Sequence, residues 1–182
     1  MTTFSVPTRS EVNTKNQGIF DHLEKQLGFV PNLYATYALS DNALERYLSF
    51  SSAKSSLSNK EKEVVNLVVS EVNQCAYCLA AHTAIAKGNG FTDPQILQIR
   101  AGEVDFDQRL DHLVALAKNI TENRGRADQV LITSFLQAGY TQENLVDLIV
   151  QVGDKTISNY IHNLTQVPID FPEVPVLEKT VV

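Results

Sequence analysis

EVVNLVVSEVNQCAYCLAAH, residues 63 to 82, is the stretch that decides both the fold and the chemistry of this chain. It contains the two cysteines of the 182-residue protein, Cys75 and Cys78, and His82 follows four residues later. A disulfide-stabilised scaffold would need further cysteines, so the pair favours a functional site.

Apolar residues recur at spacings of three and four along the chain, and alternating β-branched runs bounded by tight turns are missing. The sequence therefore predicts an all-α fold, a helical bundle built around a central helical hairpin that carries the Cys-x-x-Cys motif. Ser58–Glu61 is a capping-box pattern that opens the first helix of this hairpin. Asn73 and Gln74 interrupt that helix, and the second is expected from Cys75 to Lys87.

The whole chain, residues 1–182, is expected to form one domain, because its length and its 43% hydrophobic content suffice for a core. Within it we expect a helical extension over 1–56, a core over 57–165 and a Pro-rich tail over 166–182. Pro168, Pro172 and Pro175 prevent the tail from continuing a helix. Other helices are expected over Asn13–Leu27, from Ser40, from Asp93, over Gln108–Arg124, and on either side of Gly139.

The formal net charge is -6, and the lysines and arginines are scattered. This pattern argues against nucleic acid and anionic membranes as partners. The N-terminal MTTFSVPTRSEV lacks a basic segment followed by an apolar run, and no apolar stretch approaches the roughly 20 residues of a membrane span. We therefore expect a cytoplasmic protein, in which a free dithiol can persist.

On one helix, Cys75, Cys78 and His82 fall within a stripe roughly 60° wide. The pair can then cycle between dithiol and disulfide, because residues three apart lie within disulfide range. Leu79, Ile85 and Ala86 flank the stripe and suggest an apolar cleft. If Asn73 caps the helix, Cys75 lies in the first turn, where free N–H groups favour a thiolate, whereas Cys78 has His82 one turn further on.

Glu63 becomes part of this site if the chain folds back at Asn73 and Gln74. About ten residues precede that turn and about eight follow it, so the hairpin places Glu63 beside His82. Glu71 would then lie near the turn and Cys75. The alternative for Glu63 is a first-turn acid that interacts with the helix dipole.

Other readings of the motif remain open. The cysteines could simply fill the core. They could also bind zinc with His82, in which case a fourth ligand would come from Glu63 or one of the remaining histidines, which are otherwise expected on the surface or satisfied in the core: His22, His112 and His162. Covalent haem would require histidine directly after Cys78, and a thioredoxin-type site would require a preceding strand. We expect no bound cofactor and no metal.

The spacing Glu63-x11-Cys75-x-x-Cys78-x-x-x-His82, with a Leu-Ser-x-x-Glu helix start before it and AIAKGNGFTDPQI after it, resembles the alkylhydroperoxidase D-like, peroxidase-related branch of the carboxymuconolactone decarboxylase superfamily. Weaker similarity extends over nearly the whole chain. One departure is Tyr77, where the well-characterised peroxidases of the family have histidine.

The resemblance implies an all-α oligomer, a trimer or hexamer, with a thiol-dependent peroxidase site. Cys75 and Cys78 match the redox pair of the family, His82 its histidine and Glu63 its glutamate. The implied substrate is a hydroperoxide, and the implied reductant is an external thiol or dithiol protein. The apolar flank of Leu79, Ile85 and Ala86 predicts that organic hydroperoxides are preferred, because their alkyl part can be buried there. His82, oriented by Glu63, would take the proton of Cys78, and Cys75 would then close the disulfide.

Two other classes of function remain as alternatives: a thiol-disulfide oxidoreductase or redox sensor without peroxide turnover, and a non-catalytic oligomeric binding protein. Self-association is also expected from the residues themselves. VVNLVVSEV and ENLVDLIVQV are apolar over more than one face, and a chain of this length cannot bury every such face. We expect an interface away from the dithiol, including the N-terminal segment and the tail.

Overall fold

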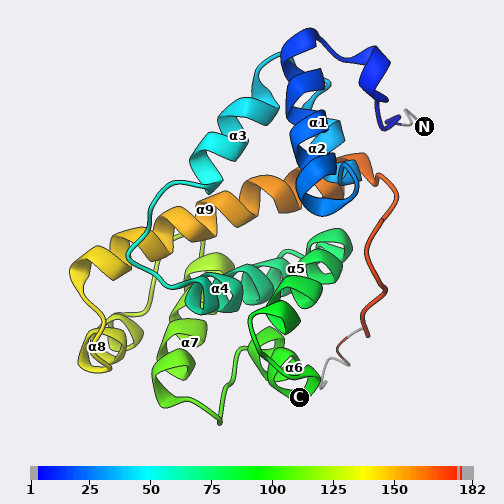
Figure 1. The fold of residues 1–182 in the computed structure, drawn as a ribbon. Helices are drawn as coiled ribbons and strands as arrows, with labels where there is room; N and C mark the ends of the chain where they lie inside the picture. Colours follow the sequence, from blue (N-terminus) through cyan, green and yellow to red (C-terminus); the bar gives the residue numbers. More distant parts are fainter. Residues whose placement is uncertain (1–3, 176, 178–182) are drawn as a thin grey trace. The chain divides into compact units, whose positions relative to one another are not determined.

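The computed structural model describes residues 4–175 and 177, and every regular element in this part of the chain is helical, so the all-α prediction is confirmed (Figure 1). A short 3-10 helix, η1, comes first. The elements in chain order are η1 (Arg9–Glu11), α1 (Thr14–Leu27), α2 (Asn32–Tyr37), α3 (Ala43–Ser51), α4 (Asn59–Val72), α5 (Ala76–Gly88), α6 (Asp93–Ala101), α7 (Gln108–Glu122), α8 (Gln129–Gln137) and α9 (Gln142–Thr165).

The described chain forms two compact units. One contains the residues up to Lys54 together with Ile161–Asp170, and the other contains Ser55–Tyr160 with the chain from Phe171 on. In the first unit, α1 begins one residue later than predicted because Asn13 is its N-cap, and Gly28 ends it in a left-handed conformation. The rings of Tyr37 and Tyr47 stack there at 4.5 Å.

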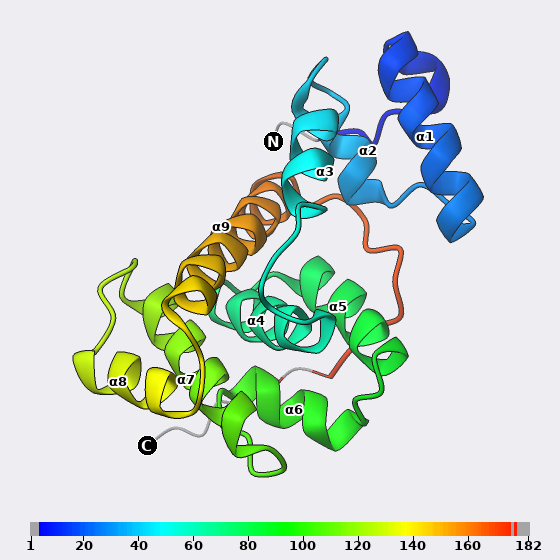
Figure 2. The ribbon, with the colours of Figure 1, turned by 60° about the vertical axis from the view of Figure 1, so that its left-hand side comes forward.

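The second unit is built around α4, which packs against α5, α6 and α7 (Figure 2). The predicted capping box is present: the side chain of Ser58 accepts from the Glu61 N–H, and the Glu61 carboxylate accepts from the Ser58 N–H at 2.8 Å. Every α4 residue from Glu63 to Ser70 is buried. The apolar faces of VVNLVVSEV are therefore covered within the unit, so the expectation that this helix needs a partner chain was wrong.

The turn between α4 and α5 differs in one detail from the prediction. Gln74 takes a positive φ of 55°, and Cys75, rather than Asn73, is the N-cap of α5. The Asn73 side-chain amide instead donates to Asn159 Oδ1 at 3.0 Å. Because that partner lies far along the chain, local sequence could not reveal it. Cys75 consequently stands just before the first turn of α5 and not within it.

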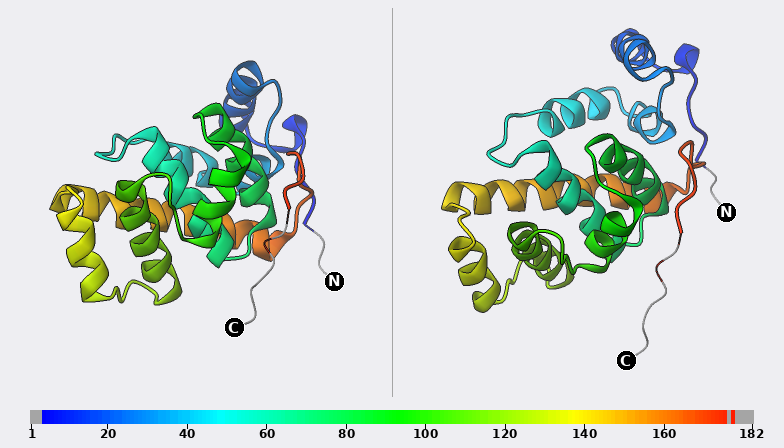
Figure 3. Two further views of the ribbon diagram at one scale, coloured as in Figure 1. Left: turned by 90° about the horizontal axis from the view of Figure 1, so that it is seen from below. Right: turned by 60° about the horizontal axis from the view of Figure 1, so that its bottom comes forward.

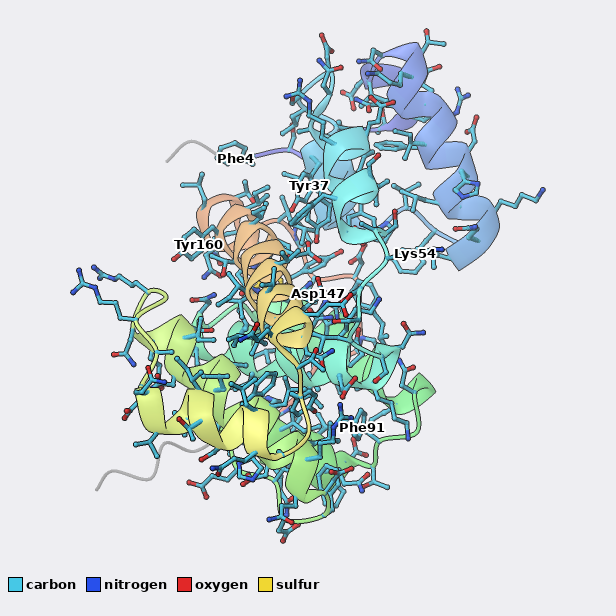
Figure 4. All side chains as sticks on the ribbon, turned by 90° about the vertical axis from the view of Figure 1, so that its left-hand side faces the viewer. Phe4, Tyr37, Lys54, Phe91, Asp147 and Tyr160 are labelled. Carbon is cyan, nitrogen blue, oxygen red and sulfur yellow. The ribbon has the colours of Figure 1, made fainter. Side chains whose placement is uncertain are left out.

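Helix α9 has its polar and apolar faces reversed relative to an ordinary surface helix. Up to Tyr160, its inward residues include buried polar side chains, whereas its exposed face is apolar and carries no charge between Val146 and Tyr160. Figure 3 shows α9 as one long helix, and Figure 4 labels Tyr160, a residue that is 61% exposed. Across the described residues, no helix is both long and apolar enough to cross a membrane.

The division into an extension over 1–56, a core over 57–165 and a tail over 166–182 stays a prediction. The tail is free of helix from 166 to 175, as its prolines require. Residues 176 and 178–182 of the tail, and residues 1–3 at the other end, lie outside the described residues.

Candidate active site

The two cysteines form one buried dithiol at the start of α5. The Sγ atoms of Cys75 and Cys78 lie 2.6 Å apart, both thiols are free, and the residues are 0% and 2% exposed. Cys75 Sγ also accepts from the Cys78 N–H at 3.3 Å, as the side chain of an N-cap does. The sulfurs can therefore form a bond with little movement of the backbone.

The helical hairpin brings Glu63 and His82 together, as the count of residues about the turn predicted. His82 Nδ1 lies 2.7 Å from Glu63 Oε2. Glu63 Oε1 accepts a second hydrogen bond at 3.0 Å from the Asn66 amide, which in turn accepts from Gln151 of α9. Glu63 is thus a buried partner of the histidine and not a first-turn acid facing solvent.

Lys155 on α9 completes this chain of side chains, and sequence reasoning missed it. Its Nζ lies 2.6 Å from His82 Nε2, and the residue is 5% exposed. The two ring nitrogens of His82 therefore face a carboxylate on one side and an ammonium on the other. A neutral imidazole satisfies both, donating from Nδ1 to Glu63 and accepting at Nε2 from Lys155.

The electrostatics of the site separate the two thiols. The hydrogen bond from the Cys75 thiol is the largest cause that lowers the pKa of Cys78, and burial acts in the opposite direction. The charge of Lys155 and the side chains of Asn159 and Ser158 lower this pKa further, to about 7. The same bond and burial raise the pKa of Cys75 far above its ordinary value. Near neutral pH Cys78 is therefore the cysteine that ionises, whereas Cys75 stays a thiol.

The environment of His82 keeps its ring neutral. Burial lowers the pKa of His82, and the charge of Lys155 lowers it further, against the opposing effects of Glu63 and Asp154. For Glu63, burial acts to raise the pKa, but the contact with His82, the charge of Lys155 and the hydrogen bond from Asn66 outweigh it. Glu63 is therefore ionised and His82 uncharged at neutral pH.

The residues expected to flank the dithiol divide into two groups. Leu79 and Ala86 are buried, but Ile85 is 44% exposed, so the apolar cleft expected along all three residues was wrong at that end. Tyr77, where the well-characterised peroxidases have histidine, is 2% exposed, and its ring meets that of Phe171 edge-on. Glu71, expected near Cys75, pairs with Arg100 at 2.8 Å.

Two of the remaining histidines have surroundings of their own. His162 is buried in the first unit and lies 3.2 Å from the Val167 carbonyl oxygen. His112 lines a cavity beside α7 and α8 that includes Arg109 and Ser134. No cluster of three or more His, Cys, Asp or Glu side chains in the described part of the chain is placed to hold a metal ion.

The missed residues lie on α9, where Lys155, Ser158 and Asn159 face the site. The segment VGDKTISNY carried a signal, because charged and polar residues recur there at one-turn spacing within an otherwise apolar helix. These polar residues were not predicted to be part of the site. The amide of Asn159 also donates to Ser70 Oγ at 3.1 Å, which ties α9 to α4 beneath the dithiol.

The comparisons with known proteins agree with this geometry. Residues 39–107 match the model of the carboxymuconolactone decarboxylase family. No curated protein matches the sequence significantly. Solved structures that share the fold include an uncharacterized peroxidase-related protein from Silicibacter sp. TM1040, with 21% identity, a TM-score of 0.78, and coverage of 91% of this chain and 90% of that one.

Two further structures share the fold. An uncharacterized peroxidase-related protein with an alkylhydroperoxidase AhpD core from Ralstonia eutropha JMP134 has 19% identity and a TM-score of 0.83, covering 92% of this chain and 91% of its own. The debrominase Bmp8 in complex with 2,3,4-tribromopyrrole has 16% identity and a TM-score of 0.76, covering 93% of each chain. The family model thus matches the part of the chain that contains the dithiol, and the solved structures share the fold of nearly the whole chain.

Proposed function

We propose that the protein is a thiol-dependent peroxidase that reduces hydroperoxides through a dithiol–disulfide cycle of Cys75 and Cys78. The observation that carries this proposal is the pair of adjacent free thiols with opposite pKa shifts. A low pKa provides a nucleophilic thiolate at neutral pH, and a thiol 2.6 Å away can resolve the oxidised product.

In the proposed reaction, the Cys78 thiolate attacks the terminal oxygen of the hydroperoxide. An S–O bond forms, the O–O bond breaks, and the departing alkoxide takes a proton to leave as the alcohol. Cys75 then attacks the sulfenic sulfur, which forms the S–S bond and releases water. Two electrons from two thiols thus reduce one hydroperoxide. An external thiol or dithiol protein returns the disulfide to two thiols by exchange.

Glu63 and His82 act on this cycle as one unit. Their 2.7 Å hydrogen bond supports that role, and burial of both residues keeps the interaction strong. Among the hydrogen bonds of the described residues none joins His82 to Cys78, and His82 Nε2 lies 2.6 Å from Lys155 Nζ. The exposure of Ile85 removes one of the three side chains from which a preference for organic hydroperoxides was expected. Leu79 and Ala86 still support that preference.

A turnover assay tests the proposal. Purified protein with a recycling dithiol is given cumene hydroperoxide, and consumption of the hydroperoxide is followed against Cys78→Ser as the matched control. We expect turnover in the wild type and loss of it in the variant. Turnover that survives Cys78→Ser, or none in the wild type, contradicts the proposal.

Two other acceptors separate the alternatives in the same assay. Reduction of a small disulfide without reduction of any hydroperoxide would assign a thiol-disulfide oxidoreductase. Loss of bromide from 2,3,4-tribromopyrrole, the molecule bound to the debrominase of shared fold, would assign a different two-electron acceptor to the dithiol. Inactivity toward all three acceptors would leave the non-catalytic binding protein.

We also propose that the protein is a homo-oligomer, and that a second copy covers the exposed face of α9. That face follows alternating four- and three-residue steps through Val146, Val150, Gly153, Ile157 and Tyr160, the spacing of a helix that packs against another helix. A Cβ at Gly153 would meet nothing within 4 Å, so a neighbouring backbone has room there. An uncharged face of this kind suits a copy of itself about a twofold axis.

A further inference from the structure

Lys155 is a buried lysine that takes no part in the bond changes of the proposed reaction. Lysine is seldom buried, because removing its charge from water costs several kcal/mol unless the charge is compensated. Lys155 is 5% exposed and lies on the inward face of α9, beside Asp154 and opposite His82 of α5. Because the buried charge of Lys155 is retained beside Asp154 and His82, we infer that this charge has a role in the site.

The hydrogen bonds of Lys155 leave part of its ammonium available to the dithiol. An ammonium has three N–H donors. Among the hydrogen bonds of the described residues, His82 Nε2 is the acceptor of one of them, at 2.6 Å. Asn159, one turn further along α9, is hydrogen-bonded to Asn73 at 3.0 Å and to Ser70 at 3.1 Å, so this face of the helix lies against the turn that carries the dithiol.

We propose that Lys155 is the cation that holds Cys78 in its thiolate form, and that Glu63 and His82 act by positioning Lys155. The charges around Lys155 fit this role. Two carboxylates face it, Asp154 on α9 and, through His82, Glu63 on α4, and the Cys78 thiolate is the third anion. The negative Glu63 polarises the His82 ring, so the ring is a better acceptor for the Lys155 N–H.

This arrangement changes the role of His82 in the proposed reaction. A ring nitrogen that accepts from Lys155 has no free lone pair with which to take the proton of Cys78. His82 instead fixes the direction of the ammonium, and the ammonium lowers the free energy of the thiolate. The inference rests on the proposed function for its purpose, but its measurement does not involve a hydroperoxide.

The test is the pH dependence of the Cys78 thiolate in a Cys75→Ser background, which leaves one thiol and keeps a hydroxyl as hydrogen-bond donor. Ultraviolet absorbance of the thiolate and the rate of alkylation by iodoacetamide are followed against pH. We expect Lys155→Met to raise the midpoint of both curves by about one pH unit, which lowers the alkylation rate at pH 6 about tenfold.

The controls separate charge from folding. Lys155→Arg keeps a cation and should stay close to the parent midpoint, and Lys87→Met removes an exposed lysine from α5 and should leave the midpoint unchanged. Circular dichroism checks folding, and if Lys155→Met does not fold, the neutral Lys155→Gln decides. A neutral variant with the parent midpoint overturns the inference. A shifted midpoint in a protein that reduces no hydroperoxide would sustain it and refute the peroxidase proposal.

Discussion

The α4–α5 hairpin and helix α9 both supply the site, but their patterns are opposite. In the hairpin, α4 is buried from Glu63 to Ser70, and the polar side chains that it buries next to the site, Glu63 and Asn66, are hydrogen-bonded. Helix α9 directs polar side chains inward and leaves apolar ones exposed. Helical periodicity alone would orient α9 the wrong way round.

This difference separates two kinds of information. The hairpin chemistry lies within 20 residues, so it can be predicted from spacing and the geometry of one turn. The contribution of α9 depends on contacts with residues more than 70 positions away, such as Lys155 with His82. A helix with a polar buried face and an apolar exposed face is informative in itself. The buried polar side chains indicate a functional site, and the exposed apolar side chains indicate a surface that binds another protein chain.

The largest expected effect lies in the hairpin. Cys78→Ser should reduce hydroperoxide turnover by at least about 1000-fold, because a hydroxyl at neutral pH is a far weaker nucleophile than a thiolate. Cys75→Ser should retain one turnover per chain, ending at the Cys78 sulfenic acid. Stopped-flow consumption of hydroperoxide by pre-reduced protein measures both, and a first turnover that survives in Cys78→Ser but is lost in Cys75→Ser would contradict the order of the cysteines.

The core of the hairpin should be the most sensitive part for stability. Leu67→Ala should reduce the free energy of unfolding by about 2 to 5 kcal/mol, because Leu67 of α4 is 0% exposed and its loss leaves a cavity. Val130→Ala on α8, where the side chain is 69% exposed, should change it by less than about 0.5 kcal/mol. Denaturant unfolding compares the two, and equal losses would contradict the central place of α4.

Substitutions in the Glu63–His82 pair should have an intermediate effect on activity. Glu63→Gln and His82→Gln are each expected to reduce hydroperoxide turnover at least tenfold, about 1.4 kcal/mol in the barrier. The disulfide should still form with a strong oxidant, because both sulfurs remain. If the double variant loses no more than either single variant, the two residues act as one unit, whereas multiplying losses would separate them.

The pH dependence follows from the lowered pKa of Cys78, about 7. The thiolate is the reactive form, so the rate of the first oxidation should level off above this pKa and fall as pH drops through it. About a tenfold loss per unit is expected once the pH is well below 6. Single-turnover rates between pH 5 and 9 measure the profile, and a flat profile across pH 7 would argue against a thiolate with this pKa.

The smallest effect on chemistry is expected on the outer face of α9. Ile157→Lys places a charge in the centre of the uncharged face and should reduce the oligomer to monomers of 20.2 kDa while changing single-turnover rates by less than about threefold. Light scattering at micromolar concentration measures the mass, with Val130→Lys on α8 as the control. A wild type that is already monomeric would refute the proposed interface.

Residues close in sequence account for what could be predicted. The capping box at Ser58, the turn at Gln74 and the pairing of Glu63 with His82 follow from local rules and one hairpin. The cap of α5 was misassigned because the Asn73 side chain bonds Asn159. Short-range sequence patterns cannot predict a hydrogen bond to a residue so far along the chain. They also cannot predict that the charge of Lys155 lies near Cys78.

The most direct test of the central claim is a count of free thiols in the native protein before and after one equivalent of hydroperoxide per chain. The account predicts that two thiols become none, that one alcohol forms per chain, and that peptide mass spectrometry finds an intrachain bond between Cys75 and Cys78. Two thiols that persist while the protein remains folded, or bonds found only between chains, would contradict it.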